Sequence, residues 1–113
     1  MRRGQIWWAA VGDPSGSGPG YRRPAIIISA NDFNESAINT VIVAFLTTST
    51  VRAKDPAVVR LPARSTGLRV TSFANFSQVY TIDRRILQSQ IGRVPDDLMP
   101  EVDDALRMVL ALG

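Results

Sequence analysis

Residues 40–46 read TVIVAFL, a continuous apolar run that is rich in β-branched side chains. A short run of this kind, without polar interruptions, is typical of a β-strand that is buried on both faces. Residues 24–29 read PAIIIS and have the same character. We therefore expect these two segments to form the buried strands of a sheet.

Weaker strand signals and turns flank these two segments. Residues 12–20 hold four glycines and two prolines, a composition that neither helix nor sheet accommodates, so we predict a loop there. Residues 31–36 are expected to form a polar turn or a single helical turn. Further strands are predicted at residues 5–11, 57–61, 72–75 and 77–81.

Helical signals are confined to the last third of the chain. Asp83 can cap a short helix that runs through Leu87. Apolar residues then recur at three- and four-residue spacing from Leu98 to Leu112, which predicts an amphipathic helix that has Pro100 in its first turn and ends at Gly113. Five to seven short strands with one dependable helix indicate a single domain over residues 1–113. We expect a mainly β fold with helices (α+β), either a small barrel or a strongly curved sheet.

Two residue types are absent, and their absence restricts the chemistry. The 113 residues include neither cysteine nor histidine. This excludes disulfides, a thiol nucleophile, histidine-containing triads and the two-histidine ribonuclease mechanism. Any catalysis must use arginine, carboxylates, hydroxyls and the backbone, and we expect no metal site and no cofactor.

The charge is distributed unevenly along the chain. Residues 1–95 hold twelve Lys or Arg against five Asp or Glu, whereas residues 96–113 hold one Arg against five acids. A basic body favours an anionic partner, although a genome with an arginine-rich codon bias would give the same composition. No apolar run approaches the roughly 20 residues that span a bilayer, so we expect a cytoplasmic protein.

Two polar clusters next to the buried strands are candidate sites. Arg22 and Arg23 lie where the glycine-rich loop meets the second apolar segment, a position that suits phosphate binding, although a solvated pair shielding a sheet edge is the alternative. Thr47 and Thr48 directly follow TVIVAFL, and their hydroxyls could donate to a phosphoryl oxygen or simply bond their own backbone. Aromatic side chains that could stack on bases are Trp7, Trp8, Tyr21 and Phe76.

The order of these features resembles a known family. The start RRGQIWWA, the junction RRPAIIIS followed by NDFN, the run TVIVAFLTTS, the segment SFANFSQVYTIDRRIL and the ending VDDALRMVLALG are similar to a MazF/PemK/Kid-type toxin. Single pieces are weakly specific, but together they cover nearly the whole chain in the right order.

The resemblance implies an SH3-like β-barrel with a C-terminal helix that forms a homodimer. It also implies a metal-independent endoribonuclease, the toxin of a type II toxin–antitoxin system, which cuts single-stranded RNA at short sequences and is held inactive by an antitoxin. The family's catalytic arginine and hydroxyl fall on Arg23 and Thr47. Its RNA-groove residues fall on Ser72 and Gln78, and Arg22 and Thr48 are further candidates for RNA binding.

The sequence departs from the family pattern in two places. Relatives usually carry an acidic residue where Gln5 stands, and a glutamate in the first loop, where residues 16–20 read GSGPG. No general base is therefore assigned. A non-catalytic barrel that binds RNA or a protein remains an alternative. A gyrase-poisoning toxin of the CcdB kind is less favoured, because it depends on a tryptophan near the end of the C-terminal helix and residues 110–113 read LALG.

Overall fold

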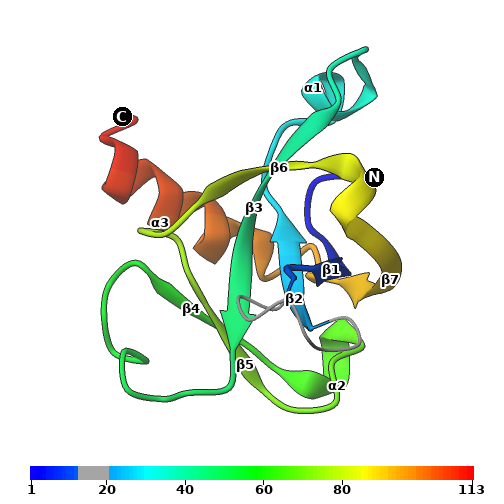
Figure 1. Ribbon diagram of the computed structural model, residues 1–113. Coiled ribbons are helices and arrows are strands. Elements are labelled where there is room, and N and C mark those ends of the chain that lie inside the picture. Colours follow the sequence, from blue (N-terminus) through cyan, green and yellow to red (C-terminus); the bar gives the residue numbers. More distant parts are fainter. Residues whose placement is uncertain (13–20) are drawn as a thin grey trace.

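A computed structural model describes residues 1–12 and 21–113 (Figure 1). The strands are β1 (Gln5–Ala10), β2 (Arg22–Ile27), β3 (Thr40–Thr47), β4 (Val58–Leu61), β5 (Ser72–Asn75), β6 (Tyr80–Asp83) and β7 (Leu87–Arg93). The helices are α1 (Asn31–Glu35), α2 (Ala63–Thr66) and α3 (Met99–Leu110), together with a 3-10 turn at Arg84–Ile86. None of the helices in this described part is both long and apolar enough to cross a bilayer.

The seven strands form one antiparallel sheet around β3. The hydrogen-bonded order is β4-β5-β3-β2-β1-β7, and β6 pairs with the first half of β3. One edge of β3 bonds β2, while the other edge bonds β6 over Thr40–Val43 and then β5 at Leu46 and Thr47. The mainly β fold with a C-terminal helix is confirmed. The expected barrel is instead a strongly curved sheet, because within the described residues the end strands β4 and β7 do not pair.

Buried side chains lie on both faces of the central strands. One cluster includes Ile26, Ala44 and Leu46 and packs against Val102 and Leu106 of α3. The second cluster, on the opposite face, consists of Ala9, Ala25, Ile27, Val41, Val43 and Leu87. Burial on both faces is the reason that the two central segments are apolar throughout, as predicted.

Several elements differ from the expectations in extent or in kind. Strand β2 begins at Arg22, two residues early, because it pairs with β1 up to Ala10. The strand expected at residues 77–81 begins at Tyr80, because a turn precedes it. Strand β7 was not expected, since it is polar and mostly exposed. Helix α3 ends before Ala111, which takes the left-handed conformation (φ 56°) expected of glycine.

Asp83 caps the 3-10 turn, as predicted for a short helix at this point. Its carboxylate accepts from the backbone N–H of Arg85 at 2.8 Å and from the Arg85 guanidinium at 3.0 Å. These side-chain and backbone hydrogen bonds with Arg85 hold the pKa of the Asp83 carboxyl below its usual value. The cap connects β6 to β7 and so turns the chain toward the edge of the sheet beside β1.

Two glycines allow β7 to cross close to α2. A Cβ on Gly92 would lie 1.9 Å from the carbonyl oxygen of Thr66, and a Cβ on Gly67 would lie 2.6 Å from that of Ile91. Gly67 also has φ 85°, which ends α2 in the left-handed region. The contact therefore requires the absence of a side chain at both positions.

Candidate nucleic-acid interface

The two candidate arginines lie within strand β2, not in a loop before it. Neighbouring residues of a strand point to opposite faces of the sheet. Arg23 therefore shares a face with Ala25 and Ile27, whereas Arg22 shares the other face with Pro24. The two guanidiniums therefore lie on different faces of the sheet, and their role in phosphate binding stays a prediction.

The guanidinium of Arg23 is held at the end of β3. Its Nη2 donates to the carbonyl oxygen of Leu46 at 3.2 Å, and its central carbon lies 5.2 Å from the centre of the Phe45 ring. The ring therefore attracts the cation from one side, while the carbonyl holds its end. A guanidinium has five N–H donors, of which this bond uses one, so the cation is fixed in place beside the peptide that joins Leu46 to Thr47.

Thr47 closes strand β3 with an exposed side chain. Its Oγ1 accepts from the backbone N–H of Ser49 at 3.1 Å, a local turn of the kind that hydroxyl residues form. A hydroxyl that accepts one bond keeps its own proton to donate. The turn therefore orients the Thr47 hydroxyl without consuming its donor.

A small hollow opens beside Thr47, on the face of the sheet that carries Arg23. Its volume is about 160 Å³, and we call it the Thr47 hollow. Phe73, Asn75, Gln78 and Arg52 line it. The remaining lining residues are Ser49, Val51 and Val58.

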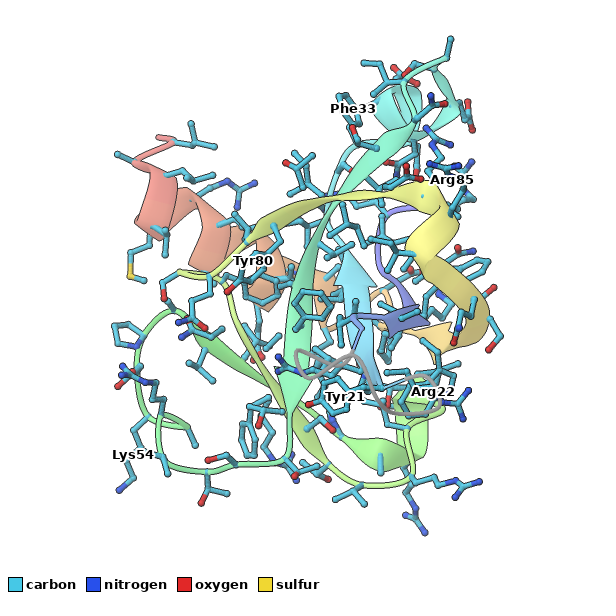
Figure 2. All side chains as sticks on the ribbon, viewed as in Figure 1. Tyr21, Arg22, Phe33, Lys54, Tyr80 and Arg85 are labelled. Carbon is cyan, nitrogen blue, oxygen red and sulfur yellow. The ribbon has the colours of Figure 1, made fainter. Side chains whose placement is uncertain are left out.

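A second hollow lies on the opposite face of the sheet. It has a volume of about 380 Å³, and we call it the Trp8 hollow. Arg22 and Trp8 both line this hollow, and the guanidinium carbon of Arg22 lies 4.3 Å from the centre of the Trp8 ring (Arg22 is labelled in Figure 2). Thr48, Ser72 and Arg69 also line it.

The six residues predicted for the site thus fall into two groups. Arg23, Thr47 and Gln78 belong to the face of the Thr47 hollow. Arg22, Thr48 and Ser72 line the Trp8 hollow, although Ser72 is only 4% exposed and its hydroxyl donates to the carbonyl oxygen of Val70 at 2.9 Å. The division follows from strand alternation at β2, β3 and β5.

Sequence reasoning missed several residues of this surface. Phe45 was read only as part of a buried strand, but its ring supports Arg23 and lies 5.4 Å from the ring of Tyr80. Asn75 was placed in a strand without a role, although the order Asn-Phe-Ser-Gln is a turn signal. Conversely, Phe76 is buried at 1% exposure, so it does not stack on a base.

The two departures from the family pattern have different outcomes. Gln5 accepts with its Oε1 from the backbone N–H of Arg2 at 2.9 Å and from the indole N–H of Trp7 at 3.0 Å, which secures the start of β1. The loop stretch without a glutamate lies outside the described residues. Within the described residues, no three acidic side chains gather as metal ligands do.

Comparison with known proteins gives a match along almost the entire chain. Residues 2–110 match the family described as the PemK-like, MazF-like toxins of type II toxin–antitoxin systems. The chain belongs to this family. The PemK/MazF-like chain is 43% identical to endoribonuclease MazF6 of Mycobacterium tuberculosis over 99% of its own length and 98% of the relative's.

More distant relatives share the same extent and fold. Endoribonuclease EndoA of Bacillus subtilis is 34% identical, with 99% of this chain and 96% of EndoA aligned. Among solved structures, an endoribonuclease in complex with its cognate antitoxin from a mycobacterial species superposes with a TM-score of 0.81 at 26% identity. That superposition covers 100% of this chain and 97% of the solved one.

Proposed function

We propose that this chain is the toxin of a type II toxin–antitoxin system, acting as a metal-independent endoribonuclease that cleaves single-stranded RNA at short sequences. The observation that carries the proposal is the Arg23 guanidinium held on the carbonyl oxygen of Leu46, the residue before Thr47 at the end of β3. Relatives that are named endoribonucleases support it over the whole chain. Because the proposed substrate is cellular RNA, we infer that the toxin acts in the cytoplasm.

The proposed reaction is an intramolecular transesterification. The 2′-oxygen of one nucleotide attacks the adjacent phosphorus, and the bond from phosphorus to the 5′-oxygen of the next nucleotide breaks. The 2′-hydroxyl loses its proton, and the leaving 5′-oxygen gains one. The products are a 2′,3′-cyclic phosphate and a free 5′-hydroxyl. Because the nucleophile is already beside the phosphorus, orientation alone is worth roughly 7–11 kcal/mol in well-aligned systems.

Arg23 and Thr47 would act on the charge that develops on the phosphoryl oxygens. A guanidinium keeps its proton in proteins, so Arg23 serves as a charge-assisted donor and not as the acid that protonates the leaving group. Thr47 would add a neutral hydrogen bond to the same oxygens. Donors that are held in place before the reaction need no reorganisation in the transition state.

Removing either donor tests this assignment. Arg23→Ala and Thr47→Ala should each lower the cleavage rate about 100- to 1000-fold, the usual loss for one preorganised donor. Thermal unfolding should be little changed, because both tips are polar and Thr47 is exposed. Cleavage of a fluorescent RNA oligonucleotide at saturating substrate measures the rate.

Arg22→Ala is the matched control on the other face of the same strand. This variant should bind RNA more weakly and with a smaller dependence of affinity on salt, while its cleavage rate at saturating RNA changes little. The reason is that a phosphate contact positions the strand without taking part in the reaction. An inactive Arg22→Ala variant beside an active Arg23→Ala variant would refute the assignment of the catalytic face. Binding without any cleavage by the wild type would favour the non-catalytic barrel.

The nucleophile is tested with a single 2′-deoxy nucleotide placed just upstream of the cut. This substrate should resist cleavage while binding almost as tightly as the ribonucleotide form, because only the attacking oxygen is lost. Cleavage of the all-ribose substrate should continue in EDTA. Products that carry a 5′-phosphate would show that water attacks instead, and would overturn the mechanism.

We further propose that two copies of the chain associate through α3 and the adjoining strands. A groove of about 490 Å³ between α3 and these strands has both apolar and charged lining residues. The apolar ones are Ile28, Ile42, Val79, Leu106, Leu110 and Leu112, and the charged ones are Arg3, Asp103 and Arg107. Leu110 is 54% exposed and Leu112 is 57% exposed, although both are apolar. Contiguous exposed apolar side chains mark interaction sites, and a second copy would cover them by a symmetric contact.

Light scattering at micromolar concentration should therefore give twice the mass of one chain. Leu110→Asp should shift the mass toward that of a single chain, because it buries a charge in the contact. Val70→Asp, at an apolar residue of similar exposure (57%) on the Trp8 hollow, should leave the mass unchanged. A single-chain mass for the wild type would refute the dimer.

The proposed antitoxin would bind the same surface as RNA. Arg52 lines the Thr47 hollow, Arg22 and Arg69 line the Trp8 hollow, and Arg23 lies over the Phe45 ring. A disordered acidic segment can wrap such a basic surface. One solved mycobacterial relative is an endoribonuclease in complex with its cognate antitoxin, which supports a partner of this kind.

Saturating cognate antitoxin should abolish both cleavage and RNA binding, measured by fluorescence anisotropy of the deoxy-blocked oligonucleotide. An unrelated acidic protein at the same concentration serves as the control. If RNA still binds at full affinity when the antitoxin is saturating, the shared surface is wrong.

A further inference from the structure

The turn Asn75–Gln78 is fixed to the core and carries two amide side chains into the Thr47 hollow. The backbone N–H of Gln78 donates to the carbonyl oxygen of Asn75 at 3.1 Å, which closes the turn. The N–H of Phe76 donates to the carbonyl oxygen of Ala57 at 2.8 Å, and its ring is buried. A site on such a supported turn holds its polar groups more precisely than a site on an open loop.

The carboxamide of Asn75 has a defined orientation. Its Oδ1 accepts from the backbone N–H of Ser77 at 3.0 Å and from the Ser77 hydroxyl at 2.6 Å. A backbone N–H can only donate, so the atom that it meets must be the oxygen of the amide. No hydrogen bond within residues 1–12 and 21–113 uses the two Nδ2–H groups of Asn75, so this amide acts toward a ligand as a donor.

The Thr47 hollow has the size of one aromatic ring. An apolar cavity of about 150 Å³ accommodates benzene, and this hollow measures about 160 Å³. Phe73, Val51 and Val58 supply apolar surface against which a flat ring can pack. A single-ring pyrimidine therefore suits the hollow better than a two-ring purine.

We propose that Asn75 is a specificity-determining residue that selects uracil at the nucleotide next to the cleaved phosphate. The inference rests on the proposed endoribonuclease function, and it follows because Thr47 lines the same hollow as Asn75. Uracil carries a carbonyl oxygen on each side of its ring N3. Whichever of these two oxygens points toward Asn75, the N–H donor meets an acceptor. Cytosine presents an amino group at one of these positions, which would oppose the Asn75 donor.

The test compares the wild type with Asn75→Asp on an RNA pool that is randomised around the cut, followed by sequencing of the product ends. The aspartate retains an oxygen for Ser77 and replaces the Nδ2–H donors by an acceptor. The wild type should prefer uracil at one position flanking the cut. Asn75→Asp should reduce the preference for uracil over cytosine at that position about tenfold, the effect of one mismatched hydrogen bond, and leave the other positions unchanged.

Two further variants separate the donor effect from charge and from folding. Asn39→Asp makes the same change at an exposed site outside the hollow and should keep the wild-type profile. Ser77→Ala removes the 2.6 Å bond but not the backbone bond, so it should relax the uracil preference less than Asn75→Asp does. Thermal unfolding of each variant verifies that it folds.

Binding provides a readout that does not depend on cleavage. Deoxy-blocked oligonucleotides with uracil or cytosine at the selected position should bind the wild type with different affinities and Asn75→Asp with nearly equal ones. A wild type that cleaves RNA but prefers a purine, or an Asn75→Asp profile identical to the wild type, would overturn the inference alone. A wild type that cleaves no RNA would overturn the proposed function instead.

Discussion

The hydrogen bonding of β3 on both of its edges is the constraint on which the rest of the molecule depends. Strand β2 pairs with one edge over Val43–Phe45, while the other edge changes partner between Val43 and Leu46, from β6 to β5. Two strands that leave one edge in different directions bend the sheet at this point. The bend brings the end of β3, with Thr47, close to β5 and to the turn that follows it.

This arrangement uses aromatic rings to hold cations in place. Arg23 rests on Phe45 and Arg22 rests on Trp8, so each face of the sheet presents a guanidinium that is already oriented. Such contacts are worth about 0.5–1 kcal/mol at exposed sites, enough to bias a long side chain toward one position. Because both guanidiniums are already held in place, binding a phosphate there costs less side-chain conformational entropy.

Local signals and long-range pairing explain what the sequence predicted and what it did not. The apolar run of β3 and the spacing in α3 are local, and both elements form, although α3 ends at Leu110 and not at Gly113 as expected. Strand β7 owes its existence to pairing with β1, more than 75 residues away, and its own residues are polar. Likewise, Arg23 and Thr47 could be named from their neighbours, but the division of the candidates between two hollows depends on where β2 begins. The role of Asn75 depends on Ser77, two residues along a turn that was read as strand.

The crossing of α2 and β7 has a consequence for how the toxin can diversify. Gly67 and Ile91, which meet at that crossing, also form part of the wall of the Trp8 hollow. A Cβ at Gly67 or Gly92 would meet the backbone of the other segment within 2.6 Å, so this part of the wall does not tolerate a side chain. Substitutions that vary the Trp8 hollow in related toxins would therefore fall on its other lining residues, such as Arg22, Thr48 and Arg69.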